Sequence, residues 1–360
     1  MKTILISTSK FGNPVTDYYK NLGNYFSYNN YKVVYIFDDF FKDYPKKIKN
    51  IKYYTWKNKR PTKISDFIFL IKIIRKERPV LCISNFGSTN IVSIVSFIFR
   101  VKHRINYIHT TSKQLSADSK KHWIKKKILK YRKKIIYSLN NHLFTNSLGT
   151  KKDTMTYYGV SEKKIFIYPL LLENSILKYK SFQERENSIC IVGRLHPSKG
   201  HRELLYLFKN CLQNYPDLKL KIIGDGYLKP ELIALSKKIN IYESIVFTGN
   251  IPNKKINKIF SSSLISISAS IDEAYGLVNI EALREGTPLI CTKTAGSIDI
   301  INEGNNGLFI NLNNQFSLSN SLEAILKEWD FYSKNALHTF KEKYKMNNIE
   351  KHFEQIKKFT

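Results

Sequence analysis

The chain has 360 residues, of which 42% are hydrophobic, and its formal net charge is +30 at pH 7. This length favours two domains over one, and the hydrophobic content is sufficient for globular cores. No stretch approaches the roughly 18 uninterrupted apolar residues of a membrane-spanning helix, so such a helix is not expected.

The net charge indicates an anionic partner, which leaves three classes: nucleic acid, an acidic membrane surface or an anionic substrate. Lys, Asn, Ile, Tyr and Phe are all abundant, as in an AT-rich coding sequence, so part of the lysine excess has a compositional origin. The cysteines form no C-x-x-C pair, which predicts buried free thiols in a reducing cytoplasm and no metal site. They are Cys82, Cys190, Cys211 and Cys291. The N-terminus lacks the features of a signal peptide and reads as a first strand.

The first part of the chain has the pattern of a parallel α/β domain, beginning with a βαβ unit whose helix is expected over residues 15–27. His109 directly follows a predicted strand, and ligands of open α/β sheets bind outside the carboxyl ends of strands. His109 is therefore a candidate site residue, and a histidine bonded within a loop is the alternative. Strands are expected over residues 2–8, 32–37, 80–84, 104–108, 143–145 and 164–169.

Residues 119–137 form an unusually basic segment that contains nine Lys or Arg. Its apolar side chains Ile124, Ile128, Tyr131 and Ile135 fall at helical spacing on one face. A packed surface helix with a solvated basic side is the simplest interpretation. A helix that lies on an anionic membrane surface is the alternative, and Trp123 would then sit at headgroup level.

Composition and pattern divide the chain into two domains and a C-terminal extension. The first domain is expected over residues 1–170 and the interdomain connection over residues 171–187, where the pattern is weak and the charge is mixed. Residues 188–335 are expected to form the second domain. Residues 336–360 are expected to be C-terminal helices, for which a return to the first domain is left open.

The second domain begins with a predicted strand over residues 188–192, followed by Gly-Arg-Leu-His-Pro-Ser-Lys-Gly at residues 193–200 and a helix. Arg194 and Lys199 can clamp a diphosphate, Arg through its planar fork and Lys as a point charge. A solvated basic loop is the alternative. Further strands are expected over residues 218–224 and 244–249, and Ile251 follows the second of these.

The most informative stretch is residues 268–291, which reads as a strand end, a loop, a helix from about Gly276 to Arg284, and a second strand. Backbone N–H groups at the helix start, near Tyr275, Gly276 and Leu277, form an anion site suited to phosphate. Seven residues separate two carboxylates, one before the helix at Glu273 and one on it at Glu281. Carboxylates beside an anion site are suited to hydroxyl groups, as in a sugar at each end of a diphosphate.

This stretch resembles the Glu-x7-Glu motif of the group-1 retaining nucleotide-sugar glycosyltransferases of GT-B architecture. The resemblance extends through Gly286-Thr287-Pro288, and the Gly193-Arg194…Lys199-Gly200 loop resembles the Gly-Arg…Lys-Gly signature of the same family. It covers most of the second domain, whereas the first domain resembles the family only in layout. The implied fold class is α/β, with two Rossmann-like domains facing an interdomain cleft.

The resemblance also implies site residues and a reaction. Arg194 and Lys199 would neutralise the departing diphosphate, Glu273 would hold the donor sugar and Glu281 the ribose. The resemblance implies six further donor-binding residues: Gly12, Gly193, Ile251, Tyr275, Gly276 and Leu277. His109 would line the reacting face. No general base is assigned, because the family is thought to use the donor phosphate, and neither a cofactor nor a metal is expected.

The expected donor is a UDP-sugar, with GDP-mannose as runner-up, and the acceptor a saccharide or lipid-linked saccharide in surface polysaccharide synthesis. An epimerase or sugar phosphorylase of the same fold is the alternative. A basic nucleic-acid-binding protein is a third possibility, which the mostly aliphatic basic segment disfavours. The expected location is cytoplasmic, with peripheral attachment to the inner face of the plasma membrane as an extension.

Overall fold

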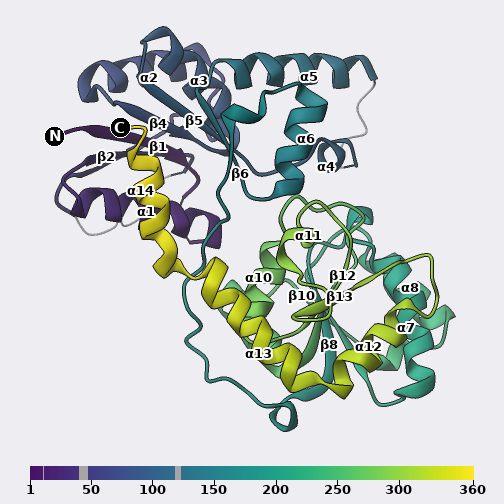
Figure 1. The fold of residues 1–360 in the computed structure, drawn as a ribbon. Helices are drawn as coiled ribbons and strands as arrows, with labels where there is room; N and C mark the ends of the chain where they lie inside the picture. Colours follow the sequence, from purple (N-terminus) through teal and green to yellow (C-terminus); the bar gives the residue numbers. More distant parts are fainter. Residues whose placement is uncertain (11, 40–47, 118–122) are drawn as a thin grey trace. The chain divides into compact units, whose positions relative to one another are not determined.

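The computed structural model describes residues 1–10, 12–39, 48–117 and 123–360 (Figure 1). The chain divides into two compact units. Unit 1 comprises Met1–Ser112, Ser119–Leu172 and Met346–Thr360, and unit 2 comprises Lys113–Asp118 and Glu173–Lys345. The first four residues of the predicted basic segment, 119–122, lie outside the described residues.

Unit 1 contains a seven-stranded parallel sheet with the strand order β3-β2-β1-β4-β5-β6-β7. The order reverses at β1, because β2 pairs with one edge of it and β4 with the other. Its strands are β1 (Thr3–Thr8), β2 (Lys32–Phe37), β3 (Ile51–Thr55), β4 (Leu81–Ser84), β5 (His103–Ile108), β6 (His142–Thr145) and β7 (Ile165–Ile167). Every residue of β1 is buried, as expected for a central strand covered on both faces.

The helices of unit 1 are α1 (Pro14–Tyr28), α2 (Ile64–Glu77), α3 (Thr89–Ile98), α5 (Trp123–Ser138), α6 (Leu148–Tyr158) and α14 (Ile349–Lys357). α4 (Ser112–Ala117) belongs to unit 2 except for its first residue. α1 begins where its sequence predicts, because Asn13 caps the backbone N–H of Thr16 and Pro14 occupies the first turn. α14 packs on α1: Tyr18 Oη lies 2.8 Å from His352 Nδ1, and the Phe353 ring contacts Phe26.

Unit 2 contains a six-stranded parallel sheet with the strand order β10-β9-β8-β11-β12-β13. Its strands are β8 (Glu186–Val192), β9 (Lys219–Ile223), β10 (Ile245–Gly249), β11 (Ser263–Ser268), β12 (Leu289–Thr292) and β13 (Gly307–Ile310). The order reverses at β8, which pairs with β9 on one edge and with β11 on the other. Both units therefore have the predicted Rossmann-like α/β architecture.

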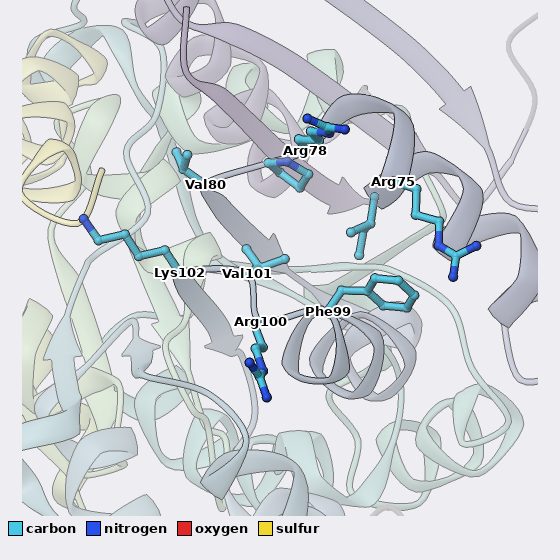
Figure 2. Close-up of a pocket in the computed structure, with 9 residues that line it drawn as sticks. Arg75, Arg78, Val80, Phe99, Arg100, Val101 and Lys102 are labelled. Atoms are coloured by element: carbon cyan, nitrogen blue, oxygen red, sulfur yellow. The ribbon is translucent and has the colours of Figure 1, made fainter.

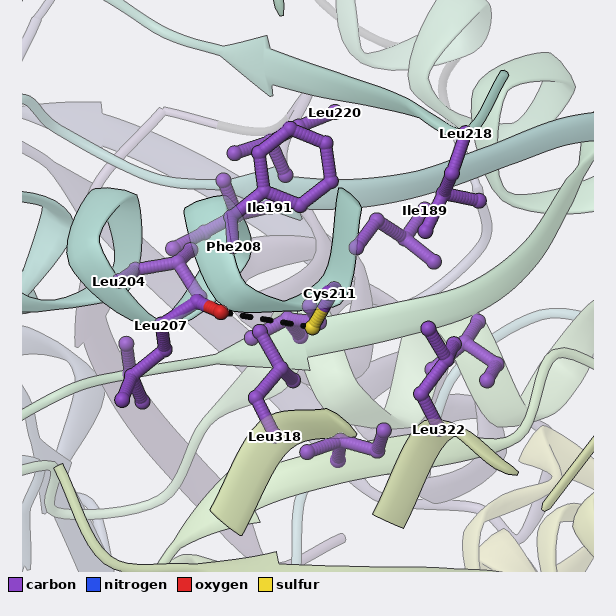
Figure 3. Packing of buried hydrophobic residues seen from close by; sticks show 14 of the residues in the cluster. Ile189, Ile191, Leu204, Leu207, Phe208, Cys211, Leu218, Leu220, Leu318 and Leu322 are labelled. Atoms are coloured by element: carbon purple, nitrogen blue, oxygen red, sulfur yellow. Dashed lines mark hydrogen bonds between the residues drawn. The ribbon is translucent and has the colours of Figure 1, made fainter. Parts of the chain in front are cut away.

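The helices of unit 2 are α7 (His201–Asn214), α8 (Lys229–Lys238), α9 (Asn253–Ser262), α10 (Leu277–Arg284), α11 (Ser297–Ile300), α12 (Ser317–Lys327) and α13 (Trp329–Thr339). Figure 3 shows the core between α7, α12 and the sheet, where Phe208 and Leu204 of α7 meet Leu220 of β9 and Leu318 of α12. Cys211 lies in this core, and all four cysteines are buried and free, as predicted.

Residues 173–187, most of the predicted connection, group with unit 2, and the buried Arg185 makes several of the contacts that hold them there. The Arg185 guanidinium donates hydrogen bonds to Ser263 O at 2.8 Å, Glu285 O at 2.9 Å and Thr287 Oγ1 at 2.9 Å. It also stacks over the Trp329 ring at 4.7 Å. Arg185 thereby joins the segment before β8 to strands and loops distant in sequence. At the other end, Met346–Thr360 groups with unit 1.

Candidate functional site

The carboxyl ends of β8 and β11 mark the point where the strand order of unit 2 reverses. From β8 the chain continues through α7 toward β9, and from β11 it continues through α10 toward β12, in the opposite direction. Such a switch point forms the usual ligand crevice of an open α/β sheet. The loop after β8 carries Gly193, Arg194 and Lys199, and the loop after β11 carries Glu273 and Tyr275. The structure therefore brings these predicted residues to one edge of the sheet.

Lys199 and Glu273 are in direct contact. Lys199 Nζ donates a hydrogen bond to Glu273 Oε2, and the two side chains form an ion pair in which they are only 17% and 15% exposed. The positive charge of Lys199 therefore weakens the repulsion that Glu273 alone would exert on an anion bound beside it. Arg194, at the other end of the same loop, has an exposed side chain.

Two glycines outside the predicted site hold the loop after β8 in position. A Cβ on Gly224 would lie 1.9 Å from Gly193 O, and one on Gly226 would lie 2.4 Å from Leu195 O. The close approach lets Leu195 N donate to Asp225 O at 3.0 Å. Neither Gly224 nor Gly226 was predicted as a site residue. Their position directly after a predicted strand is the signal that could have assigned them to this edge.

The start of α10 is built as the sequence predicts. Gly276 precedes the helix with a φ of +87°, a conformation that favours glycine, and Leu277 is its first residue. The loop before it is held by the next loop along the chain, since Gly296 N donates to Glu273 O at 2.8 Å. A Cβ on Gly296 would lie 2.3 Å from Tyr275 O, so only glycine permits this contact. The N–H groups of the first turn of α10 thus lie at the same edge as Lys199.

Glu281 and Asn279 are buried polar residues on α10. Burial raises the pKa of Glu281 to about 7, with a smaller raising effect of Glu285 and an opposing, lowering effect of Arg284. Asn279 is only 1% exposed, and within the described residues neither its amide oxygen nor its nitrogen has a hydrogen-bond partner. Asn279 was not predicted as a site residue. Its short polar side chain between the apolar residues Val278 and Ile280 is the signal that could have identified it.

Ile251 follows β10 and is half-buried. β10 is two strands away from β8 in the sheet order, which corresponds to about 10 Å along the same edge at the usual strand spacing. Ile251 is therefore at the site edge but outside the immediate surroundings of the Lys199–Glu273 pair.

His109 belongs to unit 1, where it follows β5. Its Nε2 lies 3.0 Å from Asn85 Oδ1, so Nε2 carries the hydrogen and Nδ1 is left as an acceptor. The ring stacks on Tyr107 at 4.5 Å and on Phe86 at 4.7 Å. Burial lowers the pKa of His109 to about 3, so the ring is neutral at physiological pH. Asn85 was not predicted as a site residue. It directly follows β4, and this position at the carboxyl end of a strand could have identified it as one.

Gly12 also belongs to unit 1. Its φ is +122°, and its N–H donates to Asp17 Oδ1 at 3.3 Å. A Cβ at this position would meet nothing within 4 Å, so the backbone there is open to approach. The neighbouring Phe11 lies outside the described residues.

Two cavities are lined by other residues. One, of about 710 Å³, is at the carboxyl ends of β11 to β13, and it is lined by Ser270, Thr292 and Lys293 among others. The other, of about 670 Å³, is in unit 1 at the amino ends of β4 and β5 (Figure 2). Its cationic residues Arg75, Arg78, Arg100 and Lys102 surround an apolar floor and point away from one another, so they do not converge on an anion.

The sequence of unit 2 is similar to a known family. Residues 173–345, slightly less than half of the chain, match the family described as glycosyl transferases group 1. An uncharacterized glycosyltransferase of Methanocaldococcus jannaschii is 29% identical over 172 residues, which are 47% of this chain and 44% of that protein.

A second relative is the Campylobacter jejuni N-acetylgalactosamine-N,N'-diacetylbacillosaminyl-diphospho-undecaprenol 4-alpha-N-acetylgalactosaminyltransferase. It is 28% identical over 200 residues, which are 54% of this chain and 53% of the relative. The chain thus matches about half the length of these two curated relatives. Among solved structures, Anabaena HepE in complex with UDP and glucose has a TM-score of 0.77 over 100% of both chains at 13% identity. This similarity confirms the predicted GT-B fold class.

Proposed function

We propose that this protein is a retaining glycosyltransferase. It moves a sugar from a UDP-sugar to a hydroxyl group of a saccharide or lipid-linked saccharide acceptor in surface polysaccharide synthesis. The observation that carries the proposal is the Lys199–Glu273 ion pair at the switch point of a group 1 glycosyl transferase unit. A cation near the start of a helix suits a diphosphate, and a carboxylate beside it suits sugar hydroxyls.

In this proposal the diphosphate is the leaving group, and its developing negative charge is stabilised by Lys199 and Arg194. Lys199 acts as a point charge, whereas the Arg194 guanidinium offers two parallel donors. The backbone N–H groups near Gly276 and Leu277 add to this stabilisation. Donors aimed at charge that develops in the transition state make the largest single contribution in many enzymes. Gly193 lets the backbone of the loop approach the phosphates.

The nucleoside part of the donor extends from the diphosphate along the sheet edge. Glu281 accepts hydrogen bonds from the ribose hydroxyls, and Ile251, about 10 Å from β8, contacts the base. Glu273 accepts from the hydroxyls of the transferred sugar. Asn279, whose buried amide has no partner within the described residues, is an additional candidate for this end of the donor.

His109 contributes from unit 1 as a neutral hydrogen-bonding group. Its Nδ1 is an acceptor, because Nε2 donates to Asn85 Oδ1. A ring with a pKa of about 3 supplies no positive charge to the leaving group at neutral pH. In this proposal His109 orients the sugar, and Gly12, which also belongs to unit 1, allows close approach of its backbone to the donor. The reaction needs no metal in this proposal.

The choice of donor and acceptor is supported by the similar proteins. HepE was solved with UDP and glucose, which favours a UDP-sugar over GDP-mannose. The Campylobacter relative is named for a diphospho-undecaprenol substrate, which favours a lipid-linked saccharide. The four buried free thiols fit a reducing compartment, where nucleotide-sugars are made.

The test begins with isothermal titration calorimetry against UDP, GDP, ADP and their sugar conjugates, with and without EDTA. We expect UDP and one UDP-sugar to bind with a Kd at least tenfold lower than that of nucleotides with other bases. EDTA should leave this Kd unchanged. The donor found in this way is then incubated with lipid-linked saccharides, and the anomeric configuration of the product is read by NMR.

Retention of configuration in an acceptor-dependent product supports the proposal. An inverted product, or conversion of the donor without any acceptor, contradicts it and favours an epimerase, and consumption that requires inorganic phosphate favours a phosphorylase. Lys293→Met and Glu303→Gln form the matched control, because Lys293 and Glu303 make an exposed ion pair at 3.6 Å in the same unit. These two variants should retain donor binding, which Lys199→Met should lose.

A further inference from the structure

Helix α5 of unit 1 has an apolar stripe that faces solvent. Its large apolar residues are far more exposed than is usual: Ile124 48%, Ile128 61%, Tyr131 63% and Ile135 61%. They occupy positions i, i+4, i+7 and i+11, so at about 100° per residue they lie within a sector of about 60°. The opposite side of the helix carries Ile136 and Tyr137, its buried residues.

The same helix carries seven cationic and no acidic side chains. At helical spacing, Lys125 and Arg132 lie along one side of the apolar stripe, and Lys127 and Lys134 lie along the other. All four are exposed. Two of the other cations, Lys130 and Lys133, turn toward the protein and lie over the Tyr157 and Tyr158 rings of α6. The exposed side of α5 is therefore an apolar stripe bordered by positive charge.

We propose that this side of α5 docks unit 1 on an anionic membrane surface, with the helix lying in the plane of the interface. The apolar stripe enters the boundary between headgroups and acyl chains, and the four bordering cations reach the lipid phosphates. Trp123, 60% exposed at the start of α5 with Lys127 over its ring at 5.1 Å, lies at headgroup level. The proposal is independent of the sugar-transfer reaction.

Charge selects this occupant over others. A second copy of the chain would bring the same cations against each other, which disfavours self-association through this side. A nucleic acid would be attracted by the cations but gains little from aliphatic side chains, since bases stack on aromatic rings. An anionic bilayer offers an apolar environment to the stripe and lipid phosphates to the bordering cations. No helix in the described ranges is both long enough and apolar enough to cross a bilayer.

The first experiment uses the full-length chain and sucrose-loaded vesicles of phosphatidylcholine with or without phosphatidylglycerol, from 50 to 500 mM NaCl as an experimental range. We expect binding to the anionic vesicles to weaken with salt but to persist at the upper end, because the stripe adds an apolar contribution that salt does not screen. Binding to neutral vesicles should be weak.

Two sets of substitutions separate the stripe from its border. Ile128→Ser with Ile135→Ser should reduce anionic vesicle binding by roughly tenfold at all salt concentrations. Its matched control is Ile64→Ser with Ile176→Ser, because these isoleucines are 80% and 92% exposed elsewhere. Replacing the four bordering cations, Lys125, Lys127, Arg132 and Lys134, by glutamine should reduce anionic vesicle binding on the order of a hundredfold at low salt. The matched control places glutamine at four exposed lysines of unit 2: Lys209, Lys238, Lys327 and Lys334.

A fluorescence measurement makes the test independent of the substitutions. The chain has three tryptophans, and Trp56 and Trp329 are 2% and 3% exposed, so a change on vesicle binding reports Trp123. We expect a blue shift and quenching by lipids with brominated acyl chains, both abolished by Trp123→Phe.

Three outcomes would overturn the proposal. The first is an unchanged Trp123 emission at saturating anionic vesicles. The second is equal loss of binding in the matched controls. The third is binding to duplex DNA at lower protein concentration than to vesicles, with no effect of Ile128→Ser and Ile135→Ser.

Discussion

At the scale of single residues, the Lys199–Glu273 ion pair is the strongest determinant of the site. We expect Lys199→Met to lower turnover roughly a hundredfold, because it removes a charge that stabilises the leaving diphosphate.

The same ion pair can be tested by urea unfolding. The single substitutions Lys199→Met and Glu273→Gln and the double variant form a thermodynamic cycle. A coupling free energy of about 1–2 kcal/mol is expected for a pair this shielded from water. A coupling near zero would show that the two side chains do not form this pair in solution.

Glu281 predicts a pH dependence of stability. Its pKa is about 7 in the folded chain and 4.5 as its ordinary value, so the folded state binds the extra proton between these two pH values. The contribution of Glu281 is therefore fully present below pH 4.5 and is lost as the pH rises through 7, by up to about 3 kcal/mol in the free energy of unfolding. Glu281→Gln should remove this part of the profile, as measured by urea unfolding between pH 4.5 and 8. An unchanged profile would contradict the burial of an ionisable Glu281.

At the scale of secondary-structure elements, glycines decide how closely the loops of unit 2 approach the strands. Gly200 has a φ of +64°, and a Cβ there would lie 2.0 Å from Ala269 O, at the end of β11. Gly200→Ala should therefore destabilise unit 2 by roughly 2–4 kcal/mol, and should weaken donor binding by displacing Lys199 next to it. Gly304→Ala is the matched control, since Gly304 has a φ of +78° with nothing within 4 Å of its Cβ position. That variant should lose only about 1 kcal/mol, and equal losses in the two variants would refute the backbone collision.

At the scale of the whole molecule, the C-terminal segment makes the stability of unit 1 depend on both ends of the chain. Phe353 of α14 is 1% exposed and contacts the rings of Tyr25, Phe26 and Tyr31. Phe353→Ala should therefore cost about 3–5 kcal/mol. Calorimetry in the presence of saturating UDP, which should stabilise only the transition of unit 2, tells the two transitions apart. The loss of stability should appear in the UDP-independent transition. The matched core substitution Phe208→Ala should instead destabilise the UDP-dependent transition. A shift of the UDP-dependent transition by Phe353→Ala would contradict this assignment.

The sequence determined the local elements of this protein by itself. Strand patterns, the Asn13 cap, the loop after residue 192 and the start of α10 at Gly276 all follow from interactions between residues close in the chain. The edge strands β3 and β13 were not predicted. β3 is mostly half-buried along its length, and β13 has buried residues only at its two ends, so neither shows the run of buried residues that a central strand has.

Only the tertiary structure decided which distant residues meet and which surfaces stay uncovered. Lys199 and Glu273 are 74 positions apart, and Arg185 reaches carbonyls up to 101 positions away. The His109 ring is held by Asn85, which directly follows another strand. Helical spacing predicted the apolar stripe of α5, but not whether another element covers it. The physical reason is that periodicity records which side chains share a face, whereas burial and pairing depend on what the rest of the chain brings against that face.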